Sequence, residues 1–131
     1  MGRLSGVRVV ALEEVAPVAL PGGSWSRVLL TGERVASTSA LGISSFAAGT
    51  STAMLSHATE ELAYVLTGHG ELRLEAEAVP YAAGEALYIP AGVWHAVANT
   101  GSEPVTMVFA FPHPDYPPTE RRDPDAAAFA P

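Results

Sequence analysis

The 131-residue chain contains no cysteine and no lysine. The first absence excludes disulfides and thiolate ligands, so any metal must be held by nitrogen and oxygen atoms. The second excludes Schiff-base chemistry and a lysine general base. All seven basic residues are arginine, and the formal net charge is −7. Because no basic patch is available to displace counterions from phosphates, we expect no nucleic-acid partner.

Long apolar runs are also missing. None approaches the roughly 18 residues that a membrane-spanning helix needs, and the N-terminus lacks the basic-then-apolar pattern of a secretory signal. We therefore expect a cytoplasmic protein with no membrane partner. The length and the 48% apolar content are those of one globular domain.

Amphipathic helical periodicity is scarce, whereas short β-type runs separated by Gly, Pro, Ser and Asn recur along the chain. Many short strands with such turns predict an all-β sandwich or barrel. The expected strands are residues 7–12, 25–30, 41–47, 62–66, 71–75, 87–89, 95–99 and 105–111.

The C-terminal part of the chain has a different composition. From Pro112 onward it is too rich in proline for a central strand or a helix. We therefore divide the chain into a barrel domain, residues 1–111, and a Pro-rich C-terminal tail, residues 112–131. The tail is either disordered or wraps along the body, with Tyr116 and Phe129 as candidate anchors, and residues 125–129 could form one helical turn.

The expected strand at residues 92–99 is apolar on both faces. Val93, His95 and Val97 share one face, and Trp94 and Ala96 share the other. Such a strand fits between a barrel interior and a second sheet or a second subunit. We therefore expect a homodimer.

Two histidines and one glutamate are candidate metal ligands. His57 and Glu61 lie in a passage that reads as strand, turn and strand, so they can converge inside a barrel. His95 lies on a later strand, just past the turn at residues 90–92. Two imidazoles and one carboxylate leave coordination positions open and suit Fe(II), Mn(II), Ni(II), Co(II) or Zn(II). We therefore expect one divalent metal ion, whose identity the ligand set does not fix.

The same residues belong to a longer two-part pattern. Residues 49–68 read G-x5-L-x-H-x3-E-x6-G, and residues 84–99 read G-x5-P-x-G-x2-H-x3-N. In this the chain resembles the cupin family, and nine of the ten signature positions are met. The departure is Leu55, which stands where the family has the first His of an H-x-H pair. The resemblance implies a double-stranded β-helix, or jelly-roll barrel.

The resemblance also implies roles for particular residues. His57, Glu61 and His95 match family metal ligands, and Glu61 could leave the metal and act as an acid or base. Leu55 leaves two alternatives open. Either three protein ligands hold the metal and a substrate chelates it through two atoms, or the site has lost its metal and binds an organic ligand by hydrogen bonds. We favour the metal, because it accounts for all three polar residues at once.

Apolar residues are expected to line a small pocket around this site, as is usual for small-molecule sites. The inward positions are Leu55, Phe46, Ala63, Val65, Leu87, Val97 and Phe109. Arg27 is a candidate to meet an anionic substrate at the mouth, although an ion pair with a surface acid is the simpler interpretation.

The leading hypothesis is a metal-dependent enzyme that acts on a small organic molecule. With Fe(II) it would be a dioxygenase, which we slightly favour. With Zn(II), Ni(II) or Mn(II) as a Lewis acid it would be an isomerase, cyclase or lyase. The alternative is a non-catalytic cupin that senses or stores a small ligand, since a fold does not by itself imply a function.

Overall fold

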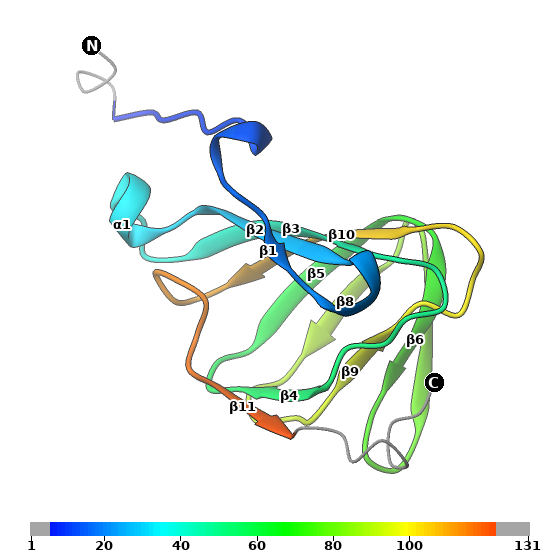
Figure 1. Ribbon diagram of the computed structural model, residues 1–131. Coiled ribbons are helices and arrows are strands. Elements are labelled where there is room, and N and C mark those ends of the chain that lie inside the picture. Colours follow the sequence, from blue (N-terminus) through cyan, green and yellow to red (C-terminus); the bar gives the residue numbers. More distant parts are fainter. Residues whose placement is uncertain (1–5, 123–131) are drawn as a thin grey trace.

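The computed structural model describes residues 6–122, which form two facing layers of antiparallel strands (Figure 1). One layer is a six-stranded sheet with the order β1-β2-β3-β10-β5-β8. Its strands are β1 (Val18–Ala19), β2 (Trp25–Leu30), β3 (Ala40–Phe46), β10 (Val105–Phe111), β5 (Glu61–Thr67) and β8 (Ala86–Ile89).

The facing layer consists of two smaller sheets. A three-stranded sheet has the order β7-β6-β9, and a two-stranded sheet pairs β11 with β4. Two isolated bridges, Ser51 with Ala98 and Leu55 with His95, join these sheets side by side. The strands are β4 (Met54–His57), β6 (His69–Arg73), β7 (Ala78–Ala82), β9 (Ala96–Ala98) and β11 (Thr119–Arg122). The all-β jelly-roll prediction is confirmed.

Helical structure is confined to short turns in the described part of the chain. They are η2 (Leu12–Glu14), η3 (Pro21–Gly23) and α1 (Gly32–Val35). Among residues 6–122, no helix is long and apolar enough to cross a membrane.

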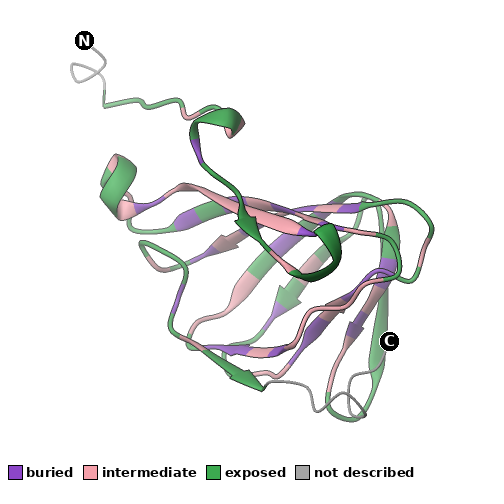
Figure 2. Ribbon diagram, in the orientation of Figure 1, coloured by how far each residue is buried: buried purple, intermediate pink, exposed green. Residues whose placement is uncertain are grey.

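The core lies between the two layers, where alternate side chains of each strand point inward. Along β10, the four alternate residues from Val105 to Phe111 are buried. Along β5, Ala63 and Val65 are buried while their neighbours face outward. Figure 2 shows buried residues alternating with more exposed ones along such strands. A polar side chain that points into the barrel is therefore shielded from solvent.

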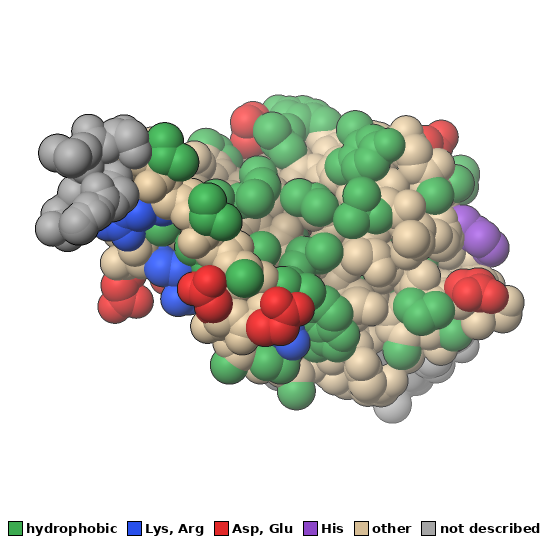
Figure 3. All heavy atoms as spheres, turned by 90° about the horizontal axis from the view of Figure 1, so that it is seen from above, with side chains coloured by type: hydrophobic (Ala, Val, Ile, Leu, Met, Phe, Trp, Pro, Cys, Tyr) green, Lys and Arg blue, Asp and Glu red, His purple; other side chains and the backbone are tan. Residues whose placement is uncertain are grey.

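The outer face of the six-stranded sheet carries several exposed apolar side chains. They are Leu41, Leu62, Tyr64, Leu66 and Tyr88. Figure 3 shows this side of the molecule, with hydrophobic side chains over its middle and the arginines gathered toward the end where the N-terminal segment lies. An apolar outer face is compatible with the expected homodimer, which stays a prediction.

Two of the expected strands, 25–30 and 105–111, have the observed bounds, and most others are shifted by one or two residues. The expected strand at residues 7–12 is wrong. Residues 7–11 form no strand, and Val7 and Val9 are 67% and 86% exposed, so their alternation has no core to face. Within the Pro-rich tail, residues 119–122 form β11. Phe129 and the helical turn expected at 125–129 lie outside the described residues.

Candidate metal centre

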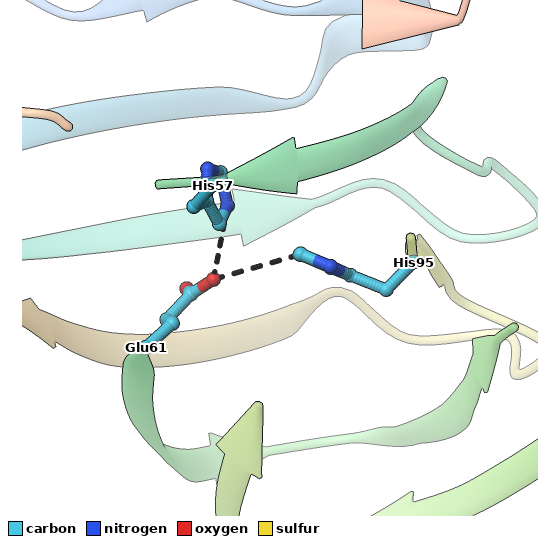
Figure 4. A group of neighbouring side chains, drawn as sticks. All are labelled: His57, Glu61 and His95. Atoms are coloured by element: carbon cyan, nitrogen blue, oxygen red, sulfur yellow. Dashed lines mark ion pairs between the residues drawn. The ribbon is translucent and has the colours of Figure 1, made fainter. Parts of the chain in front are cut away.

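The three expected ligands come from both layers and meet inside the barrel. His57 ends β4, Glu61 begins β5 in the opposite layer, and His95 directly precedes β9. The Oε1 atom of Glu61 lies 3.2 Å from Nε2 of His57 and 3.6 Å from Nε2 of His95 (Figure 4). One ligand atom from each residue fits within a group whose members are all within 4.8 Å of one another. This separation is small enough for a single metal ion to contact all three residues.

Local backbone geometry places His95 against His57. Gly92 has a φ of 80°, in the left-handed region that favours glycine. The turn that it makes lets the Gly92 N–H donate to the His57 carbonyl over 2.9 Å. Leu55 and His95 then exchange two backbone hydrogen bonds of 2.8 and 2.9 Å. The turn at residues 90–92 of the second motif therefore fixes His95 beside His57.

The hydrogen bond of His95 determines which ring nitrogen carries its proton. Its Nδ1 lies 2.9 Å from the carbonyl oxygen of Val93. A carbonyl can only accept, so Nδ1 donates its hydrogen there. In neutral His95 the Nε2 atom therefore has a free lone pair, and that atom faces Glu61.

The Nδ1 atom of His57 is also a donor, in this case to a hydroxyl group. Its Nδ1 lies 2.8 Å from Oγ1 of Thr119. The hydroxyl of Thr119 donates its single hydrogen to the Pro117 carbonyl over 2.8 Å, so it can only accept from His57. His57 therefore also presents the lone pair of Nε2 to the site.

The electrostatics of Glu61 suit a shared cation. Burial raises the pKa of Glu61, but hydrogen bonds and charge interactions with His57 and then His95 outweigh it and hold this pKa below its ordinary value of 4.5. With both Nδ1 atoms already donating elsewhere, these hydrogen bonds to Glu61 need a hydrogen on each Nε2 as well. A divalent ion would take the place of those hydrogens. A divalent metal ion satisfies all three groups together, so the donor set fits such an ion.

An aromatic wall stands beside His57. The rings of Phe111 and Tyr116 lie 5.1 and 5.4 Å from the His57 ring, and 5.2 Å from each other. Tyr116 is 42% exposed, so it connects the buried His57 with the surface. Packing against the protein raises the pKa of its phenol, and the nearby charge of Glu61 adds to this effect. The phenol is consequently a neutral hydrogen-bond donor over the physiological range of pH.

Leu55 lies beside the three ligands. It is directly opposite His95 and two residues before His57, so its half-buried side chain is on the ligands' face of β4. The other expected apolar pocket residues are part of the core or pack against it; they are Phe46, Ala63, Val65, Phe109, Leu87 and Val97. The structure therefore places this set inside the barrel.

The structure does not bring Arg27 to the site. Its cross-strand partner is Ile43, on the opposite face of β3 from the buried Gly42 and Ser44. Its Nη1 donates to the Leu12 carbonyl over 2.8 Å, and its guanidinium lies 5.1 Å from the centre of the Trp25 ring. Arg27 thus tethers the N-terminal segment to the outer face of the six-stranded sheet.

Sequence reasoning missed Thr119 as a partner of the site, and it named Tyr116 only as an anchor of the tail. Neither belongs to a motif, and the Pro-rich composition around them hid the strand that carries Thr119. Asn99, the last residue of the second motif, has a structural role. Its side-chain amide donates to the carbonyls of Phe46 and Glu103 and accepts from the Gly101 N–H.

Known proteins are similar to this chain in sequence. Two curated relatives come from Streptomyces. The polyketide synthase CurC of Streptomyces cyaneus is 36% identical over 104 residues, which are 78% of this chain and 67% of the relative. The tetracenomycin polyketide synthase protein TcmJ of Streptomyces glaucescens is 34% identical over 102 residues, 76% of this chain and 68% of the relative.

Solved structures show the same fold at lower sequence identity. The polyketide cyclase RemF of Streptomyces resistomycificus has a TM-score of 0.74 at 23% identity, over 88% of this chain and 84% of RemF. The oxalate decarboxylase of Bacillus subtilis has the same TM-score and identity, but this chain spans only 30% of its length. The Cupin_2 family model, described as a cupin domain, matches residues 42–111. The chain therefore belongs to the cupin family.

Proposed function

We propose that this protein is a metal-dependent cyclase that acts on a small organic molecule with several carbonyl groups, of the polyketide type. The observation that carries the proposal is the meeting of two buried imidazoles, both with Nε2 toward the site, and one carboxylate of lowered pKa inside an apolar barrel. The substrate class is supported by two relatives named as polyketide synthase proteins and by a neighbour in fold named as a polyketide cyclase.

His57, Glu61 and His95 would hold the divalent ion. When bound, such an ion supplies Lewis-acid polarisation of a carbonyl oxygen. Leu55 provides hydrocarbon where the family pattern has a fourth ligand, so the protein leaves more of the coordination shell to the substrate. Two oxygens of one 1,3-dicarbonyl unit are the simplest substrate atoms to use it.

The other residues of the site would bind and orient the carbon skeleton. Tyr116 would provide aromatic surface beside His57, with the buried Phe111 packed against it, and Leu55 would provide aliphatic surface beside His95. These groups exclude water from the ligands' face and favour a flat, partly conjugated chain. The exposed side of Tyr116 leaves an entrance for that chain.

Glu61 is the proposed acid and base. Both imidazole contacts involve its Oε1 atom, which leaves Oε2 to take a proton from a carbon between two carbonyls. The electron pair of that C–H bond then forms the new carbon–carbon bond to a second carbonyl carbon of the same molecule. Glu61 returns the proton to the resulting alkoxide oxygen, so that the carboxylate is regenerated.

A dioxygenase is the second candidate. Two histidines and one carboxylate are also the ligand set of non-haem Fe(II) oxygenases, and this set is the observation that favours it. A non-catalytic cupin that senses or stores a small ligand would use the same binding groups but would not convert the ligand. An experiment must therefore separate metal content, cyclisation and oxygen consumption.

The first measurement is elemental analysis of protein purified without added metal or chelator. We expect about one divalent ion per chain in the wild type, and its loss in His57→Ala, Glu61→Ala and His95→Ala. His69→Ala is the matched control, because His69 is exposed at the start of β6 and is not one of the grouped ligands. A metal-free wild type that takes up no added ion would overturn the proposal.

The second measurement is incubation with a linear tri-β-carbonyl thioester, followed by mass spectrometry and oxygen monitoring. Cyclisation without oxygen uptake supports the cyclase. Oxygen consumption that depends on iron supports the dioxygenase instead. Binding of the thioester without any change in it would leave the non-catalytic ligand-binding role as the function.

A further inference from the structure

We propose that Thr119 is a positioning residue of the metal centre, holding His57 in the tautomer and orientation that present Nε2 to the ion. The inference rests on the proposed function only in requiring that the site binds a metal. Through this residue, β11 in the Pro-rich segment would contribute to metal binding.

The contact follows from the pairing of the strands. Thr119 is the cross-strand partner of His57, so the two side chains share a face of the β11–β4 sheet. His57 Nδ1 and Thr119 Oγ1 are 2.8 Å apart. They are 62 positions apart in sequence, so the fold rather than any local motif creates this contact.

The hydroxyl has one possible role because its hydrogen is already used. Thr119 Oγ1 donates to the carbonyl of Pro117 over 2.8 Å, and Pro117 itself is buried. The oxygen can then only accept, and Nδ1 of His57 must be the donor. The row of contacts from His57 Nδ1 through Thr119 Oγ1 to the Pro117 carbonyl oxygen thus fixes the ring orientation and keeps a proton on Nδ1.

Removal of the Thr119 hydroxyl would leave the Nδ1–H group of His57 without its hydrogen-bond acceptor. The residue is only 4% exposed, so an Nδ1–H without a partner would be costly. The proton can move to Nε2, which removes the lone pair, or the ring can turn toward another partner. Loss of such an outer partner ordinarily weakens metal binding by about 10- to 100-fold.

Neither the exposure of the other β11 residues nor the backbone pairing of β11 accounts for a threonine at position 119. Thr119 is half-buried, whereas Glu120, Arg121 and Arg122 are exposed. The backbone pairing with β4 extends over four residue pairs and needs no hydroxyl. The side-chain hydrogen bond to His57 is therefore the contribution that β11 makes to the interior of the site.

The test compares Thr119→Val, which keeps the side-chain shape, with Thr119→Ser, which keeps the hydroxyl. Thr67→Val is the matched control on β5. The Thr67 hydroxyl also donates to a proline carbonyl, that of Pro104 at 3.4 Å, and accepts from the Thr106 N–H at 3.2 Å. Affinity for Zn(II) is measured by competition with a chromophoric chelator, and the His57 tautomer by long-range ¹H–¹⁵N NMR of the metal-free protein.

We expect Thr119→Val to weaken Zn(II) binding by about 10- to 100-fold and to move the His57 proton from Nδ1 toward Nε2. Thr119→Ser and Thr67→Val should keep both wild-type properties. Unchanged affinity and tautomer in Thr119→Val would overturn the inference while leaving the proposed function standing. If Thr119→Val fails to fold, Thr119→Ser decides, because its loss of affinity would show that the hydroxyl is not what matters. No Zn(II) binding by the wild type would overturn the proposed function and this inference together.

Discussion

Leu55 is the residue at which this chain departs from the cupin signature, and its position makes the departure testable. The Leu55 side chain is opposite His95 and shares a face of β4 with His57. We predict that Leu55→His adds a fourth protein ligand and tightens Zn(II) binding by at least about tenfold, an increment of about 1.4 kcal/mol. The same change should lower cyclisation, because the new imidazole occupies a position that we assign to the substrate.

The control for this gain is Leu62→His. Leu62 is 47% exposed on the outer face of β5, so a histidine there adds an imidazole without reaching the site. Both variants are compared by chelator competition and by turnover of the tri-β-carbonyl thioester. Equal affinities of Leu55→His and the wild type would show that position 55 does not face the ion.

The residues of the candidate site differ in how well the sequence predicts them. His57, Glu61 and His95 follow from the motif spacing, since turns at fixed positions bring them together, and the structure groups these three. Thr119 could not be found in this way. Its pairing with His57 depends on the path of the chain after β10, and no spacing within the segment encodes that path.

At the scale of elements, one side-chain hydrogen bond links the two outer strands of the three-stranded sheet across its central strand. Tyr81 on β7 donates through its hydroxyl to the Ala98 carbonyl on β9 over 2.7 Å. The strand between them is β6, where Gly70 is the partner of Tyr81. A Cβ at Gly70 would lie 2.0 Å from the Ala98 oxygen and 2.6 Å from the Tyr81 hydroxyl. Glycine is therefore required at this crossing.

We predict that Gly70→Ala lowers the free energy of unfolding by about 1–3 kcal/mol, because overpacking displaces both the tyrosine and the backbone. Tyr81→Phe, which removes the hydrogen bond and adds no atom, should cost about 1 kcal/mol. Urea denaturation of the two variants and the wild type measures both quantities. A Gly70→Ala protein as stable as the wild type would contradict the close packing at this position.

The strands that the sequence predicts well have long alternating or apolar runs with a core to face, as β2 and β10 do. The missed strands lack that signal. β7 contains Pro80 and lies at the edge of its sheet, where a proline is tolerated. β11 is charged over three of its four residues. β7 forms as a hairpin with its neighbour β6, whereas β11 forms because β4, distant in the sequence, is available as a partner.

For the whole molecule, the important feature is that the candidate ligands belong to opposite layers. Glu61 comes from the six-stranded sheet, whereas His57 and His95 come from the facing layer. Contacts among these three residues therefore join the two layers of the barrel. Their charge state should accordingly be visible in the stability of the entire domain, even without a metal.

We predict a pH-dependent contribution of Glu61 to the stability of the metal-free protein. Its folded-state pKa is held below 4.5, because the hydrogen bonds and charges of His57 and His95 outweigh the effect of burial. A lowered pKa means that the unfolded chain binds the proton more readily. The stabilisation is therefore present above pH 4.5 and is lost as the pH falls through the folded-state value.

The measurement is thermal unfolding in the presence of a chelator between pH 6 and pH 3. The wild type should exceed Glu61→Gln in Tm at the upper end of this range, and the difference should shrink progressively below pH 4.5. Glu120→Gln, at an exposed position on β11, should show no such trend. A difference that stays constant or grows on acidification would mean that the two imidazoles do not stabilise the carboxylate. The electrostatics of the three groups would then give no support to a shared cation.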